Sequence, residues 1–200
     1  MSSFPGRIPG KHKTAVMQIL TTQVTHAGML SDYYLRNQAR FKSWQPRVRE
    51  EHHSLAFWER RLRERARDFQ EGRAVHFIGI EAEGENEKVI GACSLTNILY
   101  SPACFCYMGY SVDADYEGQG VMTRIVEHAI DYAFNTLRMN RISANYMPAN
   151  TRSARLLEKL GFEKEGYAKR YLFINGRWED HILTSLINPG SEKSNSPGAE

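Results

Sequence analysis

The 200-residue chain lacks any long apolar run and has little charge of one sign in excess. No stretch approaches the roughly 18 apolar residues that would span a membrane, and the N-terminus lacks the apolar segment of a signal peptide. The formal net charge is only +3, which does not by itself argue for a nucleic-acid binder. We therefore expect a cytoplasmic protein with no membrane partner.

Cysteine is also scarce. The three cysteines, Cys93, Cys104 and Cys106, are odd in number and form no C-x-x-C pair, which supports neither a disulfide framework nor a zinc ribbon. Cys104 and Cys106 stand two apart in a strand-like segment, so they would share one face. Small buried apolar residues explain this pattern better than a metal pair, and we expect no metal. No cysteine has an obvious histidine partner, which disfavours a cysteine nucleophile.

Hydrophobic residues make up 42% of the chain, enough for one domain with a full core. Residues 1–13 are rich in glycine, proline and cations, and residues 188–200 are polar and low in complexity. Both ends are therefore predicted to be disordered tails. The single domain should span 14–187, without an internal repeat or linker.

The patterns within that span predict a mixed α/β sheet. Strands are expected at 15–22, 74–81, 89–99, 103–112 and 141–146, followed by two strands around Asn175–Gly176, a strong hairpin signal. Helices are expected at 26–41, from Ser54 to Gly72, after Gly120 and at 151–160. The predicted order is β-α-α-β-β-β-α-β-α-β-β, with about seven strands and about four helices.

Two glycines, Gly118 and Gly120, stand where the strand ending at Val112 gives way to a helix. No Lys-Ser/Thr follows, as a P-loop requires, and Thr123 replaces the third glycine or alanine of a dinucleotide fingerprint. The glycines would still let a ligand approach the backbone, and the helix dipole would favour an anion such as a pyrophosphate. A tight turn that uses glycine only for its φ angles explains the segment equally well.

This turn resembles the acetyl-CoA motif Q/R-x-x-G-x-G/A of the GNAT acetyltransferases, although Asp115 replaces the usual Gln or Arg. Main-chain N–H groups can bind phosphate without that side chain. Residues 145–167 resemble the family's second signature, N-x-x-S/A-x-x-L-x-x-x-G-F-x-x-E-G. The residues in register are Asn150, Ser153, Leu157, Gly161, Phe162, Glu165 and Gly166. The resemblance covers roughly 14–186 and implies the GNAT fold, a mostly antiparallel mixed sheet.

The resemblance implies acetyl-CoA as cosubstrate, bound by the strand end, the turn and the short helix. The implied cofactor-binding residues are Tyr110, Ser111, Val112, Glu117, Gly118, Gln119, Gly120, Val121, Met122, Thr123, Asn150 and Ser153. It also implies that a backbone N–H near Val112 stabilises the oxyanion and that Ser153 protonates the leaving thiolate. Ser153 is equally well explained as a first-turn hydroxyl that bonds backbone. Asp180 or Glu117 could act as a base through water, or be structural.

Segments such as "SDYYLRNQARFKSWQP" and "INGRWEDHILTSL" look closest to the RimJ branch of the RimJ/RimL group, which acetylates the N-terminal amino group of ribosomal proteins. The resemblance implies an acceptor groove at Trp44, Pro46, Tyr107 and Tyr146, although Trp44 could instead staple two helices together. A ribosome-assembly factor that binds the small subunit through the same fold, or an enzyme for a small-molecule amine, remain alternatives. The cation-rich helix at 59–73 could contact RNA or simply present a solvated face.

Overall fold

The computed structural model describes residues 16–47, 54–83 and 86–191, and the sheet at its centre has seven strands. The strands are β1 Val16–Thr21, β2 Val75–Glu83, β3 Asn86–Leu99, β4 Phe105–Val112, β5 Arg141–Ser143, β6 Glu163–Ile174 and β7 Arg177–Ile187. Their spatial order is β1-β2-β3-β4-β5-β7-β6. The β4–β5 pair is parallel and the other neighbouring pairs are antiparallel. The predicted mixed, mostly antiparallel fold is confirmed.

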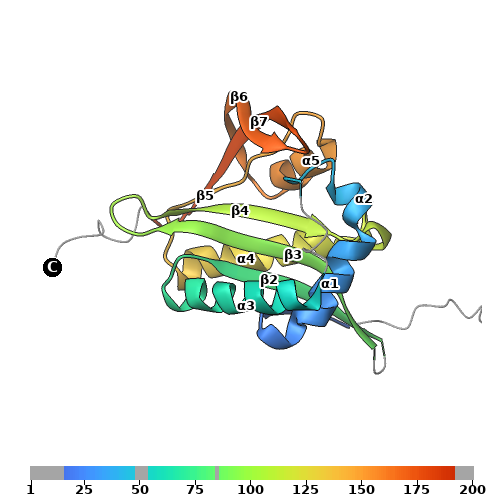
Figure 1. The fold of residues 1–200 in the computed structure, drawn as a ribbon. Helices are drawn as coiled ribbons and strands as arrows, with labels where there is room; N and C mark the ends of the chain where they lie inside the picture. The colour runs from blue at the N-terminus through green and yellow to red at the C-terminus, as the bar shows by residue number, and fades with distance from the viewer. Residues whose placement is uncertain (1–15, 48–53, 84–85, 192–200) are drawn as a thin grey trace, which may run out of the picture.

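Helices cover both faces of this sheet (Figure 1). The α-helices are α1 Ala27–Arg36, α2 Gln38–Phe41, α3 Leu55–Gln70, α4 Val121–Asp131 and α5 Thr151–Lys159. Short 3₁₀ turns cover Val24–His26 and Ala114–Tyr116, and a π-helical turn, Tyr132–Thr136, extends α4. Helices α1 and α3 lie on one face of β1–β4, and α4 lies on the other.

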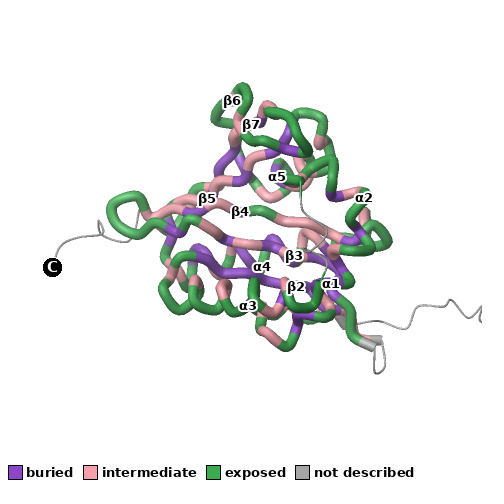
Figure 2. The backbone as a smooth tube through the Cα atoms, viewed as in Figure 1, coloured by how far each residue is buried: buried purple, intermediate pink, exposed green. Residues whose placement is uncertain are grey.

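The core has two layers because successive strand residues point to opposite faces. Phe77 joins the layer under α4, whereas its neighbour Ile78 packs under α1 and α3. Figure 2 shows the buried residues concentrated along the central strands, with the β6–β7 hairpin largely exposed. Gly79 and Gly91 let α4 approach closely, since a Cβ at either position would lie within 2.7 Å of the Ile125 side chain.

Two local predictions were wrong. The helix expected at 26–41 is interrupted at Asn37, whose side-chain amide donates to the Tyr33 carbonyl at 3.0 Å and competes with regular helical bonding. Cys104 lies outside β4 and is half-buried. Its backbone is left-handed (φ 44°), and its carbonyl accepts bonds from the N–H groups of Asn140 and Arg141. Cys106 is buried in β4 as expected.

The predicted tails fall mostly outside the described residues. Residues 188–191 are the exception, and among them the Asn188 backbone donates to Asn140 at 2.9 Å and its side chain donates to Met139 at 3.1 Å. Ordered contacts therefore continue past Ile187.

The sheet divides at β4. Strand β5 pairs with β4 only between Phe105 and Tyr107, and beyond Ser143 the chain follows β7 instead, with Tyr146 bonded to Ile182. The two halves of the sheet therefore diverge from Met108 onward, as Figure 1 shows between β4 and the group formed by α5, β6 and β7. We call this divergence the wedge; its β4 side is the edge Met108–Val112.

Candidate active site

The β4 edge directs backbone polar groups into the wedge. Asp113 donates to the Ile90 carbonyl at 2.8 Å, and Val112 stands opposite Gly91 in an antiparallel ladder. Hydrogen-bonded and non-bonded pairs alternate in such a ladder, so Val112 occupies a non-bonded pair and its N–H and C=O point away from β3. They point toward the side on which β5 has left the sheet, where a bound ligand could reach the N–H.

The glycine turn follows this edge and leads into α4. Gly118 and Gly120 both adopt left-handed conformations, with φ of 73° and 75°, and Gly120 is the N-cap of α4. An added Cβ at either glycine would meet no heavy atom within 4 Å. The turn therefore needs glycine for its backbone angles, and the space in front of it is open.

The buried carboxylate of Asp113 fixes the start of the turn. It accepts from Arg36 Nε at 2.6 Å, from Asn37 Nδ2 at 3.2 Å and from the Asp115 N–H at 3.2 Å, while the Ala114 N–H donates to Asn37 at 3.0 Å. Burial would raise the pKa of Asp113, but these bonds outweigh it and hold the pKa below its ordinary value. The carboxylate is therefore a charged anchor.

Two further arginines meet at Glu117 in the turn. Its carboxylate accepts from Arg40 on α2 and from Arg152 on α5, so one side chain connects two helices across the turn. Arg40 also donates to the carbonyl of Val112 at the end of β4. The sequence reading missed Arg36, Asn37 and Arg40, although they share one helical stripe with the buried Tyr33, which is the signal that could have found them.

A hydroxyl pair bridges the wedge. Tyr110 on β4 and Ser153 on α5 lie 2.6 Å apart, hydroxyl to hydroxyl, and Asn150 caps α5 by accepting from the Ser153 N–H at 3.1 Å. Burial raises the pKa of Tyr110 to about 12, with smaller opposing and reinforcing effects from Ser153, Cys93 and Tyr146. Both hydroxyls therefore stay protonated at neutral pH.

The expected acceptor residues lie in different settings. Trp44 and Pro46 are exposed in the turn after α2, with the Trp44 N–H bonded to Phe41. Tyr107 lies on β4 where the wedge begins, and its side chain interacts with that of Tyr171 on β6. Tyr146 is only 6% exposed and belongs to the core beneath the wedge, so it offers little surface to a peptide.

Asp180 holds the β6–β7 hairpin. It accepts from the Tyr167 hydroxyl and, at 2.8 Å, from the N–H of Arg170, a residue with positive φ in the irregular part of β6. These two bonds lower the pKa of Asp180 below its ordinary value. A shallow hollow of about 320 Å³ separates this carboxylate from residues 147–149, which precede α5.

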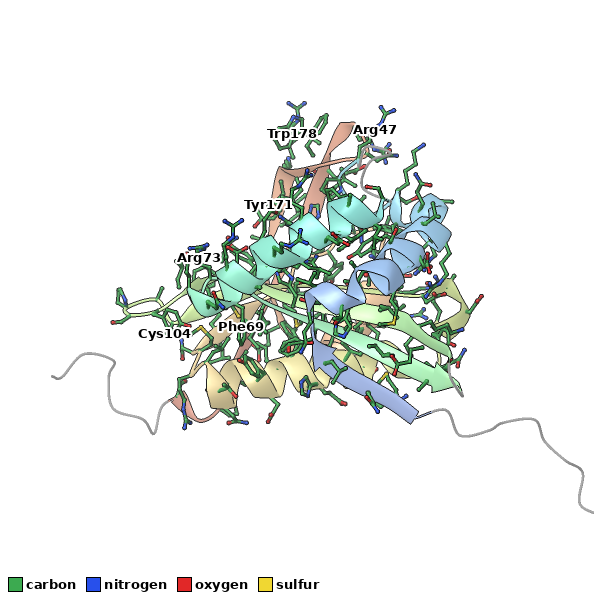
Figure 3. The ribbon with its side chains drawn as sticks, turned by 60° about the horizontal axis from the view of Figure 1, so that its bottom comes forward. Arg47, Phe69, Arg73, Cys104, Tyr171 and Trp178 are labelled. Atoms are coloured by element: carbon green, nitrogen blue, oxygen red, sulfur yellow. The ribbon has the colours of Figure 1, made fainter. Side chains whose placement is uncertain are left out.

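The hairpin also supplies aromatic residues that the sequence reading did not single out. Trp178 is 58% exposed, packs against Phe173 and lines the hollow, while the Tyr171 hydroxyl accepts from Asn145 at 3.2 Å. Figure 3 shows Trp178 at the projecting end of the molecule and Tyr171 closer to its middle.

The three carboxylates of α3 all pair with nearby arginines. Arg61 bonds Glu64, Arg63 bonds Glu59, and Arg73 bonds Asp68 just beyond the helix. This pattern favours the solvated-face explanation of the cation-rich segment over an RNA-binding surface.

Neither a metal centre nor a membrane-spanning helix is found in the described ranges. Across 16–47, 54–83 and 86–191, no three His, Cys, Asp or Glu side chains gather as a potential metal site. In the same part of the chain, every helix is too short or too polar to cross a bilayer.

The mixed, mostly antiparallel sheet and the glycine turn at the N-terminus of α4 are those that the resemblance to the GNAT acetyltransferases implied. The acetyltransferase (GNAT) domain family matches residues 21–163, and the chain belongs to this family.

Three similar proteins within this family carry specific names. The [ribosomal protein uS5]-alanine N-acetyltransferase of Escherichia coli is 43% identical over 164 residues, which cover 82% of this chain and 83% of that protein. The ribosomal-protein-S5-alanine acetyltransferase of Vibrio fischeri superposes with a TM-score of 0.84 at 35% identity, covering 91% of this chain and 96% of that chain. RimJ from Mycobacterium smegmatis, in complex with CoA-disulfide, superposes with a TM-score of 0.80 at 25% identity. The match covers 91% of this chain and 86% of that chain.

Proposed function

We propose that this protein transfers the acetyl group of acetyl-CoA to the α-amino group of the N-terminal alanine of a ribosomal protein of the uS5 type. The observation that carries the proposal is the 43% identity to the E. coli enzyme named for that alanine, over more than four fifths of both chains. Because the proposed acceptor is a ribosomal protein, the reaction would take place in the cytoplasm.

The wedge and the turn suit acetyl-CoA. The open glycine turn at the N-terminus of α4 offers N–H groups and a partial positive charge to the pyrophosphate. Arg40 and Arg152 offset the negative charge of Glu117 beside it. The β4 edge can pair with the amide groups of the pantetheine arm in the manner of an added strand. We therefore propose that residues 110–112 and 117–123, with Asn150 and Ser153, hold the cosubstrate.

The chemistry follows from where these groups lie. Direct attack of the amine on the thioester puts negative charge on the carbonyl oxygen, and the Val112 N–H that points into the wedge would stabilise it. The departing thiolate needs a proton, which the Tyr110–Ser153 pair can donate because both hydroxyls are protonated at neutral pH. No metal takes part in this scheme.

A strong base is not required. Asp180 and Glu117 are both engaged, the first with Tyr167 and Arg170 and the second with Arg40 and Arg152. The lowered pKa of Asp180 also makes it a weak base. An α-amine has a pKa near 7.7–8.0, so roughly a fifth to a third is already neutral at pH 7.4, whereas only about one lysine amine in a thousand is. We propose that water takes the proton of the α-amine.

The acceptor peptide would lie between the Trp44 turn and β7, with Tyr107 at its inner end. The hollow between residues 147–149 and Trp178 and Asp180 gives room for the residues that follow the first. A small first residue should be favoured, because the buried Tyr146 and the Tyr107–Tyr171 pair leave the inner end little freedom to move.

The test compares three acceptors by mass spectrometry and initial rate. One peptide begins with a free alanine, a second of the same composition is N-blocked and carries an internal lysine, and the third acceptor is spermidine. We expect the free N-terminus to be modified at least tenfold faster than the other two. Faster modification of the blocked peptide or of spermidine would make the protein a lysine or small-amine acetyltransferase instead.

A further inference from the structure

One helical segment contacts the whole junction between β4 and the glycine turn. The Tyr33 hydroxyl bonds Ser111 at 2.9 Å, Arg36 and Asn37 bond Asp113, and Arg40 bonds both Val112 and Glu117. We call Tyr33, Arg36, Asn37 and Arg40 the brace. Their spacing of three, one and three residues places all four on one face of α1 and α2.

Arg40 differs from the other brace residues because it touches both halves of the proposed acetyl-CoA site. One terminal nitrogen donates to the Val112 carbonyl on the β4 edge, and the other donates to Glu117 in the turn. The guanidinium also packs 4.9 Å from the Phe41 ring centre, and its buried Nε meets no acceptor among the described residues. These contacts use the planar fork of arginine, which a lysine cannot reproduce.

We propose that Arg40 is a positioning residue for acetyl transfer: it fixes the end of β4 relative to the phosphate turn, so that the Val112 N–H faces the thioester when the pyrophosphate is bound. The inference rests on the proposed function. The Val112 C=O and N–H leave the strand on the same side, so a side chain that holds the carbonyl also limits rotation of the edge that carries the N–H. Errors of about 1 Å in such positions can cost roughly 100-fold in rate.

The two contacts of Arg40 make separate demands on a replacement. In Arg40→Lys, the single ammonium can keep the charged partner Glu117 but cannot also reach Val112 in the same geometry. In Arg40→Gln, both contacts are lost. The matched control is Arg63→Gln, which removes an exposed arginine that pairs with Glu59 on α3.

The experiment measures three quantities for the full-length wild type and these variants: the melting temperature, the Kd of CoA by calorimetry, and kcat and KM for transfer to the alanine peptide. We expect Arg40→Lys to keep the Kd within about threefold of wild type while kcat falls at least tenfold. In Arg40→Gln both CoA affinity and kcat should fall, whereas Arg63→Gln should match wild type in both. The melting temperatures of Arg40→Lys and Arg63→Gln should agree within a few degrees.

Recovery of kcat by lysine, or a kcat within threefold of wild type in Arg40→Gln, would overturn the inference. A kcat that falls only as the folded fraction falls would also overturn it. Failure of the proposed function looks different: wild type would bind CoA yet acetylate no N-terminal peptide. In that case the role of Arg40 would be tested by CoA binding alone, and it would be overturned if Arg40→Gln bound CoA as tightly as wild type.

Discussion

At the scale of single residues, burial decides which protons are available. Tyr110 is held away from water beside Ser153, and its pKa of about 12 keeps its proton in place well above physiological pH. His76 has the opposite character. Burial, with Arg65 and Arg61 nearby, lowers its pKa to about 3, so it is neutral in the folded protein and bonds Ser94 at 2.7 Å.

Ser153→Ala should lower kcat about 100-fold if Ser153 relays the proton to the leaving thiolate. The fold should not change, because the Ser153 backbone N–H keeps its bond to the Asn150 cap. The measurement is steady-state kinetics beside Thr151→Ala, which removes an exposed hydroxyl from the same turn of α5. A loss below about threefold in Ser153→Ala would assign its hydroxyl a structural role only.

The lowered pKa of His76 predicts a pH-dependent stability. In the unfolded state His76 has its ordinary pKa of 6.5, whereas in the folded state it is protonated only near pH 3. The contribution of neutral His76 is therefore complete above pH 6.5 and is lost as the pH falls toward 3, by up to about 1.4 kcal/mol per pH unit. The negative charge of Asp68 partly offsets the lowering of the His76 pKa, and the hydrogen-bond partner Ser94 carries no charge.

Thermal unfolding between pH 7 and pH 5 checks this prediction. His76→Asn keeps a polar partner for Ser94 without a titrating group, so its melting temperature should fall less over this interval than that of wild type. His26, whose pKa burial also lowers, titrates in both proteins and cancels in the comparison. Parallel curves for the two proteins would show that His76 carries no such linkage.

At the scale of elements, the junction of β4, the glycine turn and α4 is where backbone conformation meets ligand. Gly118 and Gly120 are left-handed with open space beside them, a combination that a packing role alone does not require. An anion at the N-terminus of α4 would occupy the space that a side chain at these positions would take.

Gly120→Val should raise the Kd of CoA more than tenfold, since the valine side chain would enter the pyrophosphate position. A β-branched residue is also strained at this φ, so the variant should lose about 1–3 kcal/mol of stability. Gly176→Val is the matched control, because Gly176 is left-handed with open space too but lies in the β6–β7 turn. Equal CoA affinity in both variants, measured by calorimetry, would refute the phosphate-binding turn.

Sequence patterns predicted those elements whose signals are local. Ser54 caps α3 by accepting from the Phe57 N–H, and Gly72 follows the helix with a left-handed φ of 68°. Asn175 and Gly176 both have positive φ, as a type I′ turn requires. Each signal depends on residues within a few positions of one another, so a single sequence suffices to read it.

The parts that could not be predicted depend on distant partners. The break at Asn37 makes sense only once Asp113 and Ala114 lie beside it, 76 and 77 residues along the chain. The wedge arises because the segment after β5 pairs with β7 rather than with β4. Hydrophobic periodicity does not predict which neighbouring strand a segment pairs with. The engagement of Asp180 likewise depends on a strand irregularity at Arg170 that turn signals do not announce.

At the scale of the whole molecule, the sheet is incomplete at the β4 edge, and a bound ligand would complete it. Saturation with acetyl-CoA at about 100 times its Kd should add about 2.7 kcal/mol to the free energy of unfolding. For a chain of this size, that corresponds to a rise in melting temperature of roughly 5–11 °C. Differential scanning fluorimetry measures the rise, and Gly120→Val should show little of it. An absent rise in wild type would remove the cosubstrate from the proposal.

The brace and the junction that it holds are encoded more than 70 residues apart: the brace at residues 33–40 and the junction at residues 111–117. Recombination between this gene and a diverged relative would separate them whenever the crossover fell between these two segments. The hybrid would inherit one parent's arginines and the other parent's strand end, and an ion pair such as Arg36–Asp113 would survive only if both parents had the same partners. Crossovers before residue 33 or after residue 117 would transmit the set intact. Shuffled libraries should therefore tolerate exchanged N-terminal tails, α4 or β6–β7 hairpins far better than exchanged halves.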